Sequence, residues 1–342
     1  MAVTIKDVAA AAGVSPSTVS RTCKDSPSIS RETKERVRRI MAQLGYEPNV
    51  EAEPVEAFSK TIGIILPSSQ RDVYENAFHL EIIRGIGQFC NQRRYVNTVI
   101  TGQDDAEVLD AIQSMVANAQ ADGFILLYSK KDCPVAAYLR NEGLLHVIVG
   151  KAAQSANQTI YIDNDNALAG EEAADYLYEL GHRDILYFGQ RPGSTTHQLR
   201  ADGYMKACHE FNLTPHFFNS EYSRSSIQGG YQLAKELFRK PLDCTAVFAA
   251  TDSNALGILT AADEMGIDIP GHLSLIGFDN ISATALSRID LTTVDQPKRD
   301  MAVQAVDMLR DKIENGTQGY VHQILLPTLI QRGTCRKLHG RI

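Results

Sequence analysis

A row of hydroxyl side chains lies near the N-terminus, in the stretch VSPSTVSR at residues 14–21. Ser15, Ser17 and Thr18 can bond to phosphate oxygens or to base edges. Arg21, about one turn further along, can hold a guanine edge through two hydrogen bonds. Hydroxyl groups at the start of a helix are also common N-caps, so both interpretations stay open at this point. The chemistry that this row could perform is the reading of DNA.

Three helices within residues 5–46 would position these side chains. Thr4 is expected to cap the first helix, and Ser15 the second, with Pro16 at the first helical position, where its missing N–H costs nothing. The third, RETKERVRRIMAQLGY, carries apolar residues at helical spacing. Two helices separated by a short turn containing Gly form a helix-turn-helix, whose second helix enters the major groove.

Charge and cysteine content restrict the partners of the protein. The 342 residues carry a formal net charge of -7, yet the first 50 hold eight Lys or Arg against five Asp or Glu. A small basic segment on an acidic chain indicates an anionic partner at the N-terminus alone. The six Cys are scattered without a C-x-x-C pair, and neither an export signal nor a membrane span is evident. We therefore expect a cytoplasmic protein with reduced thiols and no metal site.

The chain from residue 60 onward alternates between two kinds of segment. Short runs rich in β-branched residues, such as TIGIILP and AVFAATD, are separated by amphipathic segments such as AEVLDAIQSMVANAQ. This alternation predicts an α/β fold of doubly wound parallel sheets covered by helices on both faces. Roughly 280 residues are many for one sheet, so two subdomains are expected.

The residues that follow each strand are the candidates for a binding site, because ligands of such sheets bind beyond the carboxyl ends of the strands. Carboxylates and aromatic faces suit a sugar, whose hydroxyls need polar partners and whose ring face is apolar. A strand-end cap is the alternative role for each residue alone. Asp163 and Asp165 are kept outside the set because they lie at an expected crossover between subdomains. The candidates are Asn76, Phe78, Tyr128, Lys151, Thr251, Asp252 and Asp279.

No catalytic arrangement competes with a binding function. The sequence contains no G-x-x-x-x-G-K-[ST] phosphate loop, no G-x-S-x-G elbow and no H-E-x-x-H pair. The stretch RGIGQF is an incomplete glycine motif within a predicted helix, so dinucleotide binding is not expected. We predict that the protein is not an enzyme and uses no cofactor.

The same residues resemble a known family. Residues 3–49 are similar throughout to the headpiece of the LacI/GalR family of bacterial transcriptional repressors, through T-I-x-D-V-A, G-V-S-x-x-T-V-S-R and L-G-Y-x-P-N. Residues 61–335 resemble the family's sugar-binding-protein-like core, with RADGYMKA, TDSNALGIL, LIGFDN and LTTVDQP in the expected order. The phrases ENAFHLEIIRGI, VIVGK and IDNDN look most like the maltose-operon repressors of Gram-positive bacteria.

The resemblance implies a helix-turn-helix headpiece at 1–48, a hinge at 49–60 and an effector-binding and dimerisation core at 61–342. The core would comprise two periplasmic-binding-protein-like subdomains, at about 61–161 with 293–322 and at about 162–292 with 323–342. It also implies that Arg200, with Thr251 and Asp279, grips effector hydroxyls. The implied DNA-contacting residues of the headpiece are Thr4, Ser15, Pro16, Ser17, Thr18, Ser20 and Arg21.

The hinge departs from the family pattern. Members usually carry A-R-x-L there, and paired hinge helices insert the leucines into the minor groove. This sequence keeps Ala52 but has Glu53 for the Arg and Val55 for the Leu. Acidic side chains repel phosphates. Val is also smaller than Leu, so its insertion between bases would offset less of the free energy that unstacking a base step costs. We expect a flexible hinge, with DNA affinity that is low or that rests on the headpiece.

The resulting hypothesis is a homodimeric or tetrameric repressor of a sugar-utilisation operon that binds a palindromic operator. A sugar in the cleft between the subdomains, with maltose or a related α-glucoside favoured, would alter the spacing of the headpieces. The alternative is a cytoplasmic sugar-binding sensor with weak or partner-dependent DNA binding.

Overall fold

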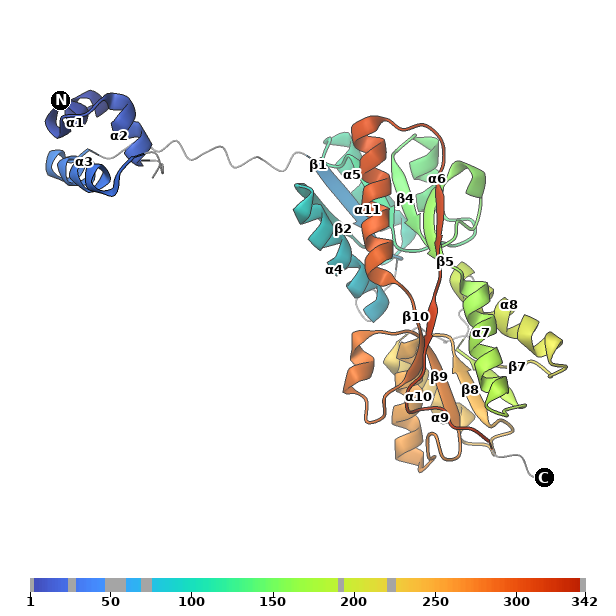
Figure 1. The fold of residues 1–342 in the computed structure, drawn as a ribbon. Coiled ribbons are helices and arrows are strands. Elements are labelled where there is room, and N and C mark those ends of the chain that lie inside the picture. Colours follow the sequence, from blue (N-terminus) through green and yellow to red (C-terminus); the bar gives the residue numbers. More distant parts are fainter. Residues whose placement is uncertain are drawn as a thin grey trace. The chain divides into compact units, whose positions relative to one another are not determined.

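The computed structural model describes residues 3–23, 29–46, 60–68, 76–189, 194–219 and 226–338. The chain divides into two compact units, Met1–Ala57 and Phe58–Ile342 (Figure 1). The described part of the first unit is helical, and the second unit contains two mostly parallel sheets with helices between their strands, which confirms the predicted fold class.

The headpiece is a three-helix unit: α1 (Ile5–Ala12), α2 (Pro16–Cys23) and α3 (Arg31–Leu44). Gly13 follows α1 with a φ of 64°, a left-handed conformation that Gly adopts without strain and that turns the chain into α2. Ser30 caps α3 by accepting a hydrogen bond from the backbone N–H of Thr33. The three helices enclose a small core made of Val8, Ala9, Ala12, Val19, Val37 and Met41.

The first subdomain of the core contains a fully parallel sheet in the order β11-β5-β4-β3-β1-β2. Helices α4 and α11 cover one face of this sheet, and α5 and α6 cover the other. The strands are β1 (Lys60–Ile65), β2 (Tyr95–Ile100), β3 (Gly123–Leu126), β4 (His146–Val149), β5 (Ile160–Asn164) and β11 (His322–Leu325). The helices are α4 (Ala77–Gln92), α5 (Asp105–Ala117), α6 (Pro134–Asn141), the 3-10 helix η1 (Ala156–Gln158) and α11 (Lys298–Asn315).

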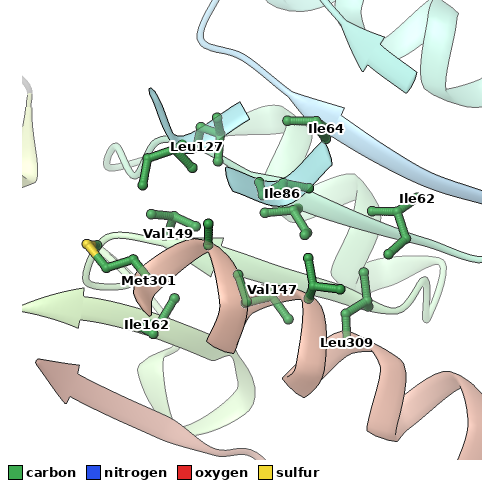
Figure 2. Packing of buried hydrophobic residues seen from close by; sticks show 14 of the residues in the cluster. Ile62, Ile64, Ile86, Leu127, Val147, Val149, Ile162, Met301 and Leu309 are labelled. Atoms are coloured by element: carbon green, nitrogen blue, oxygen red, sulfur yellow. The ribbon is translucent and has the colours of Figure 1, made fainter. Parts of the chain in front are cut away.

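Figure 2 shows the apolar layer beneath α11. Met301 and Leu309 of that helix lie against Val147, Val149 and Ile162 of the sheet, and each of these side chains is at most 5% exposed. The strands are apolar on both faces because helices cover both sides, which explains their continuous apolar runs.

The second subdomain contains a sheet in the order β12-β10-β9-β8-β6-β7, in which only β12 is antiparallel to its neighbour. Helices α7 and α8 cover one face and α9 and α10 the other. The strands are β6 (Ile185–Phe188), β7 (His216–Phe218), β8 (Ala246–Ala249), β9 (Ser274–Asp279), β10 (Thr292–Asp295) and β12 (Thr328–Ile330). The helices are α7 (Asn166–Glu179), α8 (Thr195–Glu210), α9 (Ile227–Leu237), α10 (Asp252–Met265) and the 3-10 helix η2 (Ser282–Leu286).

The chain passes between the two sheets three times: after β5, after β10 and after β11. From the sequence, the crossovers are expected near residues 161, 292 and 322, which lie at the start of these three strands or within them. In the structure, the chain crosses only after each strand has ended. Each subdomain is therefore assembled from distant parts of the chain, and the carboxyl ends of strands from both sheets supply residues to the space between them.

Candidate functional site

The hydroxyl row of the headpiece lies at the start of α2. Ser15, Ser17 and Arg21 are exposed, whereas Val19 and Thr22 on the opposite side are buried. The Ser15 hydroxyl lies 2.8 Å from that of Ser17 and 2.9 Å from that of Thr18, and it accepts the backbone N–H of Thr18 at 3.2 Å. The cap and the candidate DNA contacts are thus one cluster, at a helix N-terminus that favours a phosphate.

The remaining predicted DNA contacts differ in surroundings. Pro16 is exposed at the first position of α2, and Ser20 is half-buried. Thr4 is exposed, and its hydroxyl and backbone N–H both donate to the Asp7 carboxylate, at 2.7 and 2.8 Å. These bonds lower the pKa of Asp7. The predicted hinge contact Val55 lies outside the described residues.

A cavity of about 260 Å³ lies between the two subdomains of the core. Asn76, Phe78 and Tyr128 reach it from the first subdomain. Arg200, Thr251 and Asp279 reach it from the second. Local structure places several of them: Asn76 caps α4, and Thr251 caps α10. The structure therefore brings six of the eight predicted effector residues to one site that offers aromatic faces and polar groups together.

Arg200 is the centre of a buried hydrogen-bond network in this cavity. Its Nε donates to Asn166 Oδ1 at 2.9 Å, and its Nη1 donates to the backbone oxygen of Ala250 at 2.7 Å. Its Nη2 lies 3.5 Å from Asp279 Oδ1, and the guanidinium stacks 3.5 Å above the ring centroid of Phe278. Only 4% of Arg200 is exposed, so its orientation is set by the protein before a ligand arrives.

Two buried carboxylates flank this arginine. Burial raises the pKa of Asp279 to about 6, although Arg200, Lys298 and a hydrogen bond from Gln296 act in the opposite direction. Asp163, 2% exposed, accepts a hydrogen bond from Asn166 at 3.1 Å, and burial raises its pKa to about 7. Carboxyl groups in this position can accept or donate hydrogen bonds to hydroxyl groups of a ligand.

Two predicted effector residues do not line the cavity. Lys151 is exposed, and the chain turns away at Gly150, which has a φ of 114° and takes the lining position instead. Asp252 is fully buried beneath the sheet edge, where it accepts hydrogen bonds from the backbone N–H of Ile281 at 2.9 Å and from the Thr293 hydroxyl at 2.6 Å. Asp252 therefore stabilises the packing of α10 against the segments that carry Ile281 and Thr293, and it does not face the cavity.

Several residues that line the cavity were not predicted from the sequence. Asp163 and Asn164 are the last two residues of β5, and both line the cavity. They were not among the candidates because a crossover between the subdomains was expected at this point of the chain. Asn164 is 1% exposed, and its side-chain nitrogen has no hydrogen-bond partner among the described residues. The other lining residues are Pro67, His79, Leu127, Ser129, Lys130, Val149, Ser194, Thr196, His197, Gln296 and Met301.

Comparison with known proteins matches both parts of the chain. The profile of bacterial regulatory proteins of the lacI family matches residues 4–49, and that of the periplasmic binding protein-like domain matches residues 174–335. The HTH-type transcriptional regulator MalR of Streptococcus pneumoniae serotype 4 is 33% identical over 86% of this chain and 93% of its own length. The HTH-type transcriptional repressor PurR of Escherichia coli O139:H28 is 32% identical over 96% of both chains. The chain belongs to the LacI family.

A solved structure supports the same assignment. The transcriptional regulator CelR in complex with cellobiose aligns with a TM-score of 0.73 and 26% identity, over 97% of this chain and 99% of that one. This LacI-family chain is thus a DNA-binding transcriptional regulator with a helix-turn-helix headpiece. Among the described residues, no helix is long and apolar enough to cross a membrane, and no cluster of His, Cys, Asp and Glu could hold a metal ion.

Substituting Arg21 with Ala in this LacI-family regulator is expected to weaken operator binding about 10- to 100-fold. An Arg on a recognition helix can hold a base edge through two hydrogen bonds, and the variant would lack that contact, so binding to random DNA should change much less. Fluorescence anisotropy with operator DNA and with random DNA measures the ratio of the two dissociation constants. Arg31→Ala is the matched control, because Arg31 is 93% exposed on α3 and pairs with Glu35. Equal losses on operator and random DNA would instead assign Arg21 to a phosphate.

The unfolding free energy of the Asp252→Asn variant is expected to rise relative to that of the natural protein as the pH rises. Burial raises the pKa of Asp252 to about 7 from 3.8, so the folded state binds the proton more tightly than the unfolded state. The natural protein therefore loses stability as the pH rises from about 4 to about 7, and Asn has no proton to lose. From pH 5 to pH 8 the difference in unfolding free energy should shift by on the order of 2 kcal/mol in favour of the variant.

Urea denaturation at the two pH values measures this shift. Gln113, exposed on α5, provides the control, and Gln113→Ala should show a difference that does not depend on pH because neither side chain titrates. A pH-independent difference for Asp252→Asn as well would contradict a protonated Asp252 in the folded state.

Proposed function

We propose that this protein is a cytoplasmic, homodimeric repressor of a sugar-utilisation operon, with a sugar as its effector. Maltose or a related α-glucoside is the first candidate. The observation that carries the proposal is the cavity between the subdomains, where the fixed Arg200–Asp279 pair lies in one lining with Phe78 and Tyr128. Charged groups of this kind pair with sugar hydroxyls, and aromatic faces cover the apolar face of a sugar ring.

The size of the cavity and the similar proteins support the same class of ligand. A volume of about 260 Å³ suits a small ligand of one or two rings rather than a macromolecule. One relative is a MalR regulator, and one similar structure is a regulator bound to cellobiose. We assign effector contacts to Asn76, Phe78, Tyr128, Arg200, Thr251 and Asp279 and propose binding rather than catalysis.

Sugar binding would act on DNA through the relation of the two subdomains. A ligand that contacts both subdomains stabilises one arrangement of the subdomains over others. The size of this effect is limited by the difference between the ligand's affinities for the arrangements. In a dimer, that arrangement would set the distance between the two headpieces, which a two-fold operator requires to be about one helical turn or a multiple of it. We place the headpiece at 1–48, the hinge at 49–60 and the effector-binding core at 61–342.

In the headpiece, we propose that Ser15, Pro16, Ser17, Thr18 and Arg21 face the operator. Thr4 and Ser20 would lie near phosphates. The exposed hydroxyl cluster at the start of α2 supports this assignment. With Glu53 and Val55 in the hinge, we expect the headpiece to supply most of the DNA affinity.

Fluorescence anisotropy with a palindromic operator from the gene's own promoter tests the proposal, at two salt concentrations and with or without maltose. Tight, salt-sensitive binding that maltose alters is the expected result. If neither maltose nor other α-glucosides change the affinity for the operator, the proposed effector is wrong. A calorimetric maltose signal without preference for the operator over random DNA would favour a sugar sensor that needs a partner to bind DNA.

A further inference from the structure

The turn that carries Asp279 has an unusual backbone. Asp279 has a φ of 121° and Asn280 a φ of 48°, and both values lie in regions that residues other than Gly rarely adopt. Such conformations persist only where surrounding contacts hold them. Because the Asp279 side chain lines the cavity beside Arg200, the contacts that hold this turn also decide where a cavity carboxylate lies.

Part of the support comes from the second subdomain itself. Asp252 accepts the backbone N–H of Ile281 at 2.9 Å. The Asn280 side chain donates to Asp295 at 2.9 Å and accepts from Arg332 at 2.7 Å. These three contacts fix the middle of the turn to its own subdomain.

The rest of the support comes from the first subdomain. Glu81 of α4 accepts two hydrogen bonds on Oε1, from the backbone N–H and from the hydroxyl of Ser282, both at 2.8 Å. Its Oε2 lies 3.5 Å from the ammonium of Lys298, the first residue of α11. Lys298 in turn donates to the backbone oxygens of Asp279 and, at 3.0 Å, of Asn280.

The Glu81–Lys298 ion pair is partly shielded from water. The Glu81 side chain is 25% exposed and that of Lys298 is 11% exposed, so water screens the pair less than it screens a surface ion pair. Glu81 is absent from the cavity lining, yet it lies one turn after Phe78, which lines the cavity on the same helix. One side chain thus joins an effector-facing helix of the first subdomain to an effector-facing turn of the second.

We propose that Glu81 is a positioning residue for effector binding. By holding Ser282 and Lys298, Glu81 keeps the strained turn in place and so presents the Asp279 carboxylate to the effector. Through the same contact, the presence of an effector at Asp279 is transmitted to α4. This inference rests on the proposed effector function of the cavity.

Isothermal titration calorimetry of the full chain with maltose tests the binding step. Glu81→Ala should raise the Kd about tenfold, because it removes charge-assisted hydrogen bonds that hold a ligand contact in place. Glu81→Gln keeps an acceptor for Ser282 and should restore the Kd to within about threefold. Glu142→Ala, an exposed glutamate after α6, is the control and should leave the Kd unchanged. An unchanged Kd for Glu81→Ala would overturn the proposal.

A second measurement needs no ligand. Hydrogen exchange followed by mass spectrometry should show a peptide containing residues 279–284 exchanging about tenfold faster in Glu81→Ala, with unaltered rates in Glu142→Ala. If the natural protein does not bind maltose, the proposed effector is wrong, and the exchange result then decides whether Glu81 holds the turn. Faster exchange confined to the turn and to the first turns of α4 would support it. Unchanged exchange there, or faster exchange throughout the core, would overturn it.

Discussion

Arg200→Met is expected to eliminate measurable effector binding and to lower the free energy of unfolding of the core by about 3–5 kcal/mol. The guanidinium is 4% exposed and satisfies Asn166, the Ala250 backbone oxygen and Asp279 at once. Met fills a similar volume but leaves the buried acceptors of Asn166 and Ala250 without this donor, and it leaves the Asp279 carboxylate without its cationic partner. Chemical denaturation and calorimetry with maltose measure the two effects.

The double variant Arg200→Met with Asp279→Asn separates charge from packing. Removing both members of a buried pair costs less than removing one, so the double variant should regain part of the stability that Arg200→Met loses. Effector binding should not return, because the double variant lacks both of the charged groups proposed to contact the effector. Arg299→Met, at an exposed position of α11, should alter neither quantity. Additive losses in the double variant would contradict a coupled Arg200–Asp279 pair.

Gly203→Ala is expected to lower the free energy of unfolding by about 3 kcal/mol. Gly203 lies on α8 where that helix packs against α7, and an added Cβ would lie 2.0 Å from the Ala167 backbone oxygen and 2.8 Å from the Glu171 backbone nitrogen. Both neighbouring atoms belong to backbone, so the helices must separate to accept a methyl group. Since α8 carries Arg200 and α7 begins at Asn166, the displacement should also weaken effector binding.

Gly87→Ala in α4 is the matched control. The nearest atoms to a Cβ there belong to the Asn97 side chain, at 3.7 Å, so the methyl group fits. Because Ala favours a helix more than Gly, this variant should be up to about 1 kcal/mol more stable than the natural protein. Thermal denaturation compares the two. Equal stability of Gly203→Ala and the natural protein would show that α7 and α8 can separate without cost.

Local signals in the sequence identified the headpiece because its structure depends on short-range chemistry. The capping residues Thr4 and Ser15 begin their helices as expected, Ser30 caps the third helix, and Gly13 ends α1. Each of these effects acts within one helical turn, so it is visible in a window of a few residues. The alternation of strands and helices similarly identified the two parallel sheets.

Position along the sequence does not determine which residues reach the cavity. Thr251 and Asp252 both follow β8, and their position after the strand made both of them candidates. Thr251 caps α10 and faces the cavity, whereas Asp252 points beneath the 279–282 turn. Successive residues at a strand-to-helix junction point in different directions, and only the packing of neighbouring segments decides which direction meets the ligand space.

By itself, the sequence determined the order of helices and strands, the fold class, the helix-turn-helix and most of the residues at the carboxyl ends of the strands. Tertiary structure alone decided that Asp163 and Asn164 join the cavity, that Lys151 and Asp252 leave it, and that Glu81 reaches Ser282 across 201 positions of the chain. Propensities and caps act between neighbouring residues. Contacts across three crossovers depend on how two whole sheets pack, and no local pattern encodes that geometry.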